Sequence, residues 1–257
     1  MSGADAAGAG GGGGGAGAAG AGGGRGGLEL RAASGGLLDE PLALNVRGLG
    51  GPAGDTLIWR ARLRDDDGRV WRAQASDPLT LSDAWTPAKS SGGAVAALQS
   101  LRPVSLDVRV EAPDGRAASR TLTRSVLAEG ARVRRWRDGL AATLFLPAQR
   151  TSTSALVLDG TADEEAAAAA APTAALLASR GVLVLLVTPP RRGGDRERLL
   201  RDAAERLEQL AASAVELLPV PPPTAPGVPA RADAHDRAVA WDELLARVGA
   251  TPRAVPG

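Results

Sequence analysis

The sequence predicts a mixed α and β protein in which a β-sandwich precedes a short α/β domain. Apolar and polar residues alternate in short segments between residues 37 and 128, which is typical of half-buried strands. A strand–helix–strand pattern follows over residues 155–188, and residues 1–36 are mostly glycine and alanine. We therefore expect a disordered tail at 1–36, a sandwich at 37–128 and an abbreviated α/β domain at 129–257.

The expected tail contains too few apolar side chains to offset the entropy of ordering its backbone. Its glycine run invites comparison with a phosphate-binding loop. Such a loop lies between a strand and a helix, and no strand-like segment precedes this one. Disorder is the interpretation that the composition favours.

Alternation at every second position predicts the strands of the sandwich. Leu57, Trp59 and Ala61 would face one side of a sheet, while Arg60 and Arg62 would face the other. Two Asp-Gly turns separate consecutive segments, and Asp-Gly supplies the left-handed conformations of tight hairpins. Such spacing is typical of a small antiparallel sandwich of the immunoglobulin-like kind. The expected strands lie within residues 42–49, 56–64, 69–75, 104–112 and 120–128.

The second half predicts few strands. Two segments around Asp138-Gly139 form either a linker hairpin or the edge of a new sheet. A buried strand then ends at Gly160, a helix covers Thr161 to Arg180 with a kink or restart at Pro172, and an apolar strand follows. Periodicity further predicts an amphipathic helix over 194–212, a strand over 214–220, an extended linker over 221–230 and a closing helix over 232–249.

Composition excludes several classes of function. The chain has 30 basic and 29 acidic residues, interleaved along the sequence, so no nucleic-acid footprint is visible. It has no cysteine, which excludes thiolate zinc sites and a cysteine nucleophile. Without a signal-peptide pattern or a stretch of about 18 to 20 apolar residues, we expect a soluble, cytoplasmic protein with no membrane span.

Several motifs resemble one family in their order. They are "LLDEPLALNVRGL" from residue 37, "LRDDDGRVWRA" from 63, "LQSLRP" at 98–103, "DGLAATLFLP" at 138–147 and "ALLASRGVLVLLV" at 175–187. Together they resemble the acyl-CoA thioester hydrolases and bile acid-CoA:amino acid N-acyltransferase. That resemblance implies a β-sandwich fused to an α/β-hydrolase domain, acyl-CoA thioesters as substrates, and a Ser or Cys nucleophile with an Asp and a His.

The chain departs from this family where catalysis is concerned. No serine has glycines at both flanking positions of a Gly-x-Ser-x-Gly elbow. By resemblance Asp195 stands near the position of the triad acid, whereas the histidine expected soon after "VELL" falls in "PPPTAP", which contains none. The chain therefore either acts on acyl-CoA through an unusual or partner-supplied nucleophile, or is a catalytically dead relative that serves as an interaction module or has no present function.

The remaining candidates each have a simpler structural interpretation. His235, the only histidine, is expected on an exposed helix face, and Asp195 is expected to cap a helix N-terminus. Carboxylates at Asp163, Glu164 and Glu165 suit the dipole of a helix start better than a metal site. We therefore expect no cofactor and no metal.

The tryptophans divide into two groups by context. Trp59 and Trp71 flank a hairpin at strand spacing, which indicates the core, whereas Trp85 in a polar loop is a candidate contact residue. The strand arginines indicate a solvated surface. An abbreviated sheet is also expected to expose apolar edges and to favour self-association.

Overall fold

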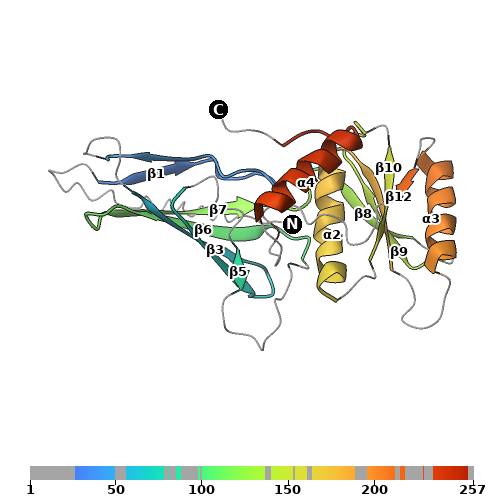
Figure 1. Cartoon of the computed structure of the whole chain (residues 1–257), viewed down its shortest axis with the longest axis horizontal. Helices are drawn as coiled ribbons and strands as arrows, with labels where there is room; N and C mark the ends of the chain where they lie inside the picture. Colours follow the sequence, from blue (N-terminus) through green and yellow to red (C-terminus); the bar gives the residue numbers. More distant parts are fainter. Residues whose placement is uncertain are drawn as a thin grey trace, which may run out of the picture.

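The computed structural model is a mixed α and β protein that is rich in sheet (Figure 1). It describes residues 27–49, 56–77, 81, 85–87, 98, 100–136, 140–152, 154–160, 164–188, 196–211, 215–217, 228 and 234–253, with side chains for all of these except 86–87, 164–169, 234–235 and 237.

Two antiparallel sheets form the N-terminal half of the described chain. A two-stranded sheet pairs β1 with β2, and a five-stranded sheet has the order β5-β4-β3-β6-β7. Their bounds are Glu29–Ala32 (β1), Leu44–Arg47 (β2), Ile58–Arg64 (β3), Val70–Ala75 (β4), Thr86–Pro87 (β5), Val104–Glu111 (β6) and Ala117–Arg124 (β7). Burial alternates strictly along β3 and β6, so one face of the larger sheet is core and the other is solvated.

Strand β1 corrects the expected extent of the tail, since disorder was predicted up to residue 36. Leu30 lies opposite Val46 on β2 and joins the buried core cluster. The apolar positions Leu28 and Leu30 alternate with Glu29 and Arg31 for only a few residues beside the glycine run, so the strand pattern is weak in the sequence. The rest of that segment, residues 1–26, lies outside the described residues.

Both expected hairpin turns are confirmed. Gly68 between β3 and β4 has φ 80°, and Gly115 between β6 and β7 has φ 83°, which is the left-handed region that glycine adopts without strain. Trp59 and Trp71 are buried in the core as predicted. The expectation for Trp85 is wrong: its side chain is only 6% exposed and belongs to the same core cluster as Trp59 and Trp71.

The C-terminal half contains a second five-stranded sheet of order β12-β10-β11-β9-β8. Strand β10 is parallel to β11 and β12, while β9 is antiparallel to both β11 and β8, so the hairpin around Asp138-Gly139 is the edge of a new sheet. The elements are β8 (Arg132–Trp136), β9 (Ala142–Leu146), β10 (Ala155–Asp159), α2 (Glu164–Ser179), β11 (Leu183–Val187), α3 (Arg196–Ala211), β12 (Val215–Leu217) and α4 (Ala234–Arg247).

Helices cover both faces of this sheet, which explains the continuously apolar sequences of β10 and β11. Leu156 and Leu158 share a buried cluster with α2, whereas Ala155 and Val157 share another with α3. In Figure 1 α2 and α3 lie on opposite sides of the sheet, with α4 on the side of α2. Helix α2 runs through Pro172 as one element, so the expected restart there does not occur.

Other elements match the expected pattern less completely. Helix α3 buries Ala203 and Leu207, but Leu210 is 53% exposed because it falls outside the stripe that faces the sheet. Helix α4 buries Trp241 and Leu244 as expected. Among the described residues, none of the helices combines the length and apolar character that a membrane-spanning helix needs.

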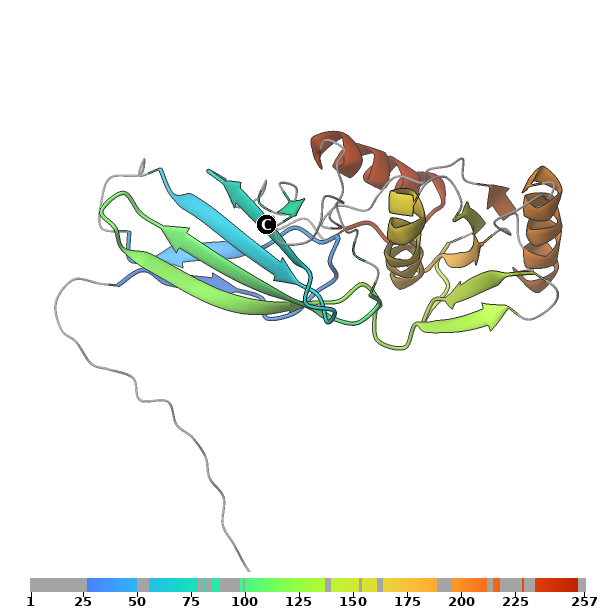
Figure 2. The ribbon, with the colours of Figure 1, turned by 90° about the horizontal axis from the view of Figure 1, so that it is seen from below.

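A single buried cluster continues from the N-terminal sheets into the layer of α2 and α4. It includes Trp71 and Leu106 on one side and Leu176 and Trp241 on the other. Figure 2 shows the five-stranded sheet of β3–β7 and the α2 layer side by side along the long axis. The two halves are therefore joined by a shared apolar core rather than by a linker alone.

Candidate functional site

The carboxyl edge of the second sheet is the place where open α/β sheets bind ligands. Here the parallel strands β10 and β11 end side by side at Asp159 and Val187. The Gly160 N–H donates to the Val187 carbonyl at 2.9 Å, and a Cβ on Gly160 would lie 2.9 Å from that same oxygen. The strand ends approach so closely that only glycine fits at residue 160 without a shift of the backbone.

Asp159 carries the buried charge at this edge. Its side chain is 1% exposed, and its carboxylate accepts a hydrogen bond from Nε of Arg196, the first residue of α3. The Arg196 side chain is half exposed, so the pair closes the edge from the solvent side. This ion pair ties the carboxyl end of β10 to the first residue of α3.

The site residues proposed from the sequence lie partly or wholly outside the described residues. Asp195 and Asp163 lie outside the described residues. His235 lies in the first turn of α4, and Glu164 and Glu165 begin α2, but the side chains of these three residues lie outside the described part. Among the residues whose side chains are described, there is no group of His, Asp and Glu able to hold a metal ion.

Sequence reasoning missed a buried polar cluster between the two halves of the molecule. The carboxylate of Asp39 accepts hydrogen bonds from Arg180 Nη2 at 2.9 Å, from Arg180 Nε at 3.2 Å and from Trp241 Nε1 at 3.1 Å. Asp39 belongs to the "DEPL" motif, Arg180 follows α2, and Trp241 lies in α4. Burial raises the pKa of the Asp39 carboxyl, and the bonds from Arg180 and Trp241 oppose that rise.

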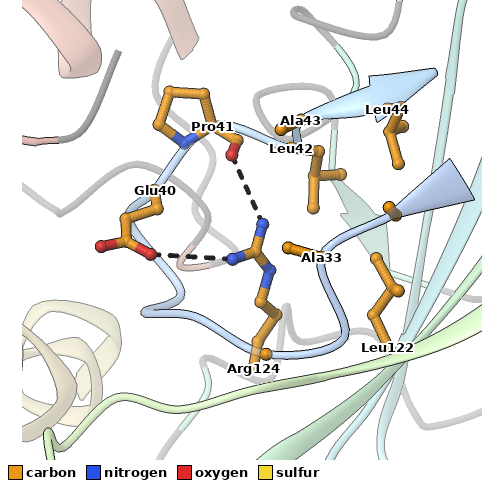
Figure 3. A pocket seen from close by; sticks show the side chains of 10 residues that line it. Ala33, Glu40, Pro41, Leu42, Ala43, Leu44, Leu122 and Arg124 are labelled. Atoms are coloured by element: carbon orange, nitrogen blue, oxygen red, sulfur yellow. Dashed lines mark hydrogen bonds and ion pairs between the residues drawn. The ribbon is translucent and has the colours of Figure 1, made fainter. Parts of the chain in front are cut away.

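The next residue of the motif, Glu40, extends this cluster towards β7 of the N-terminal sheet. Its Oε1 lies 3.4 Å from Arg180 Nη2, and its Oε2 lies 3.9 Å from Nη1 of Arg124 on β7. Figure 3 shows Arg124 between Glu40 and the carbonyl of Pro41, which accepts from Nη2 at 3.4 Å. Burial lowers the pKa of the Arg124 guanidinium, although Glu40 and Asp39 oppose that change.

A cavity of about 150 Å³ lies beside Arg124, lined mainly by small and apolar residues such as Ala32, Leu42 and Leu122. That volume is below the range of about 300–1,000 Å³ that is usual for small-molecule sites. The charged cluster next to the cavity is already satisfied within the protein. We therefore interpret Asp39, Glu40, Arg124 and Arg180 as the polar joint between the two halves.

Comparison with known proteins leaves the resemblance untested, because the chain matches no protein-family model and no curated protein sequence at a significant level.

Proposed function

We propose that the protein is a catalytically impaired member of the acyl-CoA thioester hydrolase and acyltransferase family, with an immunoglobulin-like β-sandwich followed by an abbreviated α/β-hydrolase domain. The order β8-β9-β11-β10 carries this proposal. An α/β-hydrolase sheet begins with an antiparallel pair of strands. The fourth strand of the chain then lies between the second and the third, and a helix connects the third strand to the fourth. The strands here have that order, with α2 as the crossover between β10 and β11.

The joint between the halves gives independent support. The "DEPL" motif was one of the features that suggested the family, and Asp39 and Glu40 of that motif bind Arg180 at the end of the crossover helix. Arg180 belongs to the second motif, "ALLASRGVLVLLV". Two of the motifs that resemble the family are thus in direct contact although they lie far apart in the sequence. This contact is expected if both motifs belong to one two-domain architecture.

The same sheet explains the proposed loss of catalysis. In a hydrolase the strand beyond the third one leads into the nucleophile elbow. On the side of β10 away from β11 lies the three-residue strand β12, which follows α3 in the chain. Neither the segment before it nor the segment after it has the Gly-x-Ser-x-Gly pattern, and the sequence contains no cysteine. An oxyanion-side loop after β10 would have no nucleophile to serve.

A thioester hydrolysis assay tests the proposal. Purified full-length protein is mixed with short-, medium- and long-chain acyl-CoA, and released CoA is detected with a thiol reagent, which the cysteine-free protein does not consume. We expect no release above the blank. Release that disappears in Asp195→Ala and His235→Ala, but persists in the control Asp236→Ala, would instead establish a hydrolase with an unusual nucleophile.

The substrate class is tested separately by binding. A member that keeps the acyl-CoA class is expected to bind a non-hydrolysable acyl-CoA thioether in a calorimetric titration. Absence of binding together with absence of turnover would refute a role in acyl-CoA chemistry.

Exposed apolar side chains at both sheet edges favour a second candidate, a non-catalytic interaction module. Leu217 on β12 is 48% exposed and Val133 on β8 is 37% exposed, and edge strands offer unpaired backbone groups to another chain. Light scattering and dye binding test this candidate. We expect association that weakens in Leu217→Lys, and a monomer that binds no dye would contradict it.

A further inference from the structure

The solvated face of the first five-stranded sheet is rich in arginine. Side chains on β3, β4 and β6 alternate between the buried core and this outer face. Its arginines are Arg60, Arg62, Arg64, Arg72 and Arg109, and its carboxylates are Asp107 and Glu111. This local excess of positive charge contrasts with the formal charge of +1 for the whole chain.

Strand register brings four of these arginines together. Arg62 lies opposite Arg72 on β4, and Arg60 lies opposite Arg109 on β6. Directly opposite residues have Cβ atoms about 4.5–5.5 Å apart, and like charges at such positions destabilise a sheet. Because Arg60 and Arg62 are two residues apart on one strand, both like-charge pairs border the same area.

The carboxylates on this face neutralise only part of that charge. Glu111 Oε2 lies 2.7 Å from Arg60 Nη1 and 3.9 Å from Arg109 Nε. Asp107, which lies opposite Arg62 in the register, instead accepts a hydrogen bond from Thr121 at 2.7 Å. Within the described part of the chain, no carboxylate lies within ion-pairing distance of Arg62.

The surface is hollowed where the arginines meet. The hollow has a volume of about 720 Å³, and its lining includes four arginines, one carboxylate and two neutral polar residues: Arg60, Arg62, Arg72, Arg109, Asp107, Gln74 and Ser119. That volume is within the range of about 300–1,000 Å³ that small-molecule sites occupy. Gln74 and Ser119 add neutral groups that can both donate and accept hydrogen bonds.

We propose that this hollow binds the phosphate groups of a small polyphosphate ligand such as a nucleoside diphosphate. A guanidinium matches phosphate in a planar, two-bond arrangement, and the four arginines around the hollow are placed to donate to two linked phosphates. Asp107 lines the hollow beside the arginines and Glu111 lies on the same face, so this surface can accept only a few phosphate charges before it repels the rest of a long polyanion. These charges favour a small ligand over a nucleic acid.

Calorimetric titration at low salt tests the proposal on the full-length protein. Pyrophosphate and ADP are expected to bind, and adenosine is not. The double variant Arg62→Ala with Arg72→Ala is expected to weaken both interactions at least tenfold. A matched control, Arg132→Ala with Arg134→Ala on the exposed strand β8, removes the same charge elsewhere and is expected to leave the affinity unchanged. Coenzyme A serves as a second phosphate source, and tighter binding of either ADP or CoA identifies which one the hollow accepts.

Two further variants separate the site from general charge and from misfolding. Arg62→Lys with Arg72→Lys keeps the charge but loses the two-bond geometry, so binding is expected to weaken in this variant too. The alanine double variant is expected to keep a cooperative thermal transition, which shows that its loss of binding does not come from misfolding. No binding of pyrophosphate or ADP, equal weakening in the β8 control, or binding of a single-stranded oligonucleotide in place of ADP would each overturn the proposal. This inference does not depend on acyl-CoA chemistry, since it is tested without a thioester.

Discussion

Arg180→Ala is expected to cause a large loss of stability, because it removes the cationic partner of a buried carboxylate. Asp39 is 1% exposed and Arg180 is 5% exposed, so neither charge has water as an alternative partner. Two N–H donors of Arg180 reach Asp39, at 2.9 and 3.2 Å. After the substitution, only the Trp241 N–H among the described side chains would still donate to that carboxylate.

The expected magnitude comes from these two lost bonds. A hydrogen bond to a charged group contributes about 1.5–3 kcal/mol, and removal of one partner from a buried ion pair costs about 3–5 kcal/mol. We therefore expect the free energy of unfolding to fall by about 3–5 kcal/mol at neutral pH. For a domain whose total stability is about 5–15 kcal/mol, that loss is a large fraction of the whole.

The loss should depend on pH in a defined direction. Burial already raises the pKa of Asp39 in the folded protein, and Arg180 opposes the rise. Without Arg180 the pKa rises further, so the folded state holds a proton that the unfolded state has released. Stability of Arg180→Ala is therefore expected to increase as the pH falls from neutrality through the raised folded pKa towards the unfolded value of about 3.9.

Urea unfolding followed by tryptophan fluorescence measures both effects. The control is Arg31→Ala, which breaks the exposed pair between Arg31 and Glu29 at 2.8 Å, where the side chains are 50% and 54% exposed. We expect the control to leave the unfolding midpoint unchanged, because solvent screens that pair. A loss below about 1 kcal/mol in Arg180→Ala, or a loss independent of pH, would refute the reasoning from burial.

Two further predictions concern packing. Gly160→Ala places a Cβ 2.9 Å from the Val187 carbonyl and should cost about 1–3 kcal/mol, whereas Gly35→Ala meets nothing within 4 Å and should stay within about 0.5 kcal/mol of the wild type. Equal thermal midpoints for these two variants would contradict the proposed close approach. Leu63→Ala in the core of the first five-stranded sheet should cost about 2–5 kcal/mol, against about 0.5 kcal/mol or less for the exposed Leu210→Ala. Chemical unfolding that ranks Leu210 above Leu63 would show the burial pattern to be wrong.

Most strands could be predicted because their signals are local. Alternation between Trp59 and Arg60 fixes which side faces the core, and Asp-Gly at residues 67–68 fixes the turn that follows. Predictions were wrong where the local sequence pattern was weak or misleading. Strand β1 lies beside a glycine run, and Trp85 lies in a polar segment, yet both are held by contacts with residues distant in sequence.

For the candidate site, the sequence predicted only which catalytic residue types are absent. The sequence alone shows that no serine lies in a Gly-x-Ser-x-Gly pattern, that there is no cysteine and that there is one histidine. The partners of Asp39 were not predictable, since Arg180 is 141 residues away and each residue by itself resembles an ordinary surface charge.

The sequence by itself therefore determined the alternation of strands, the two hairpins, the strand–helix–strand unit and the absence of a Gly-x-Ser-x-Gly pattern, because each depends on residues close together in the chain. Only the tertiary structure decided the order β12-β10-β11-β9-β8, the burial of Asp39 against Arg180 and the gathering of arginines around Arg62. These features depend on which strands become neighbours and in which register they pair. Register moves whole sets of side chains between faces and partners, so the pattern within one strand cannot specify it.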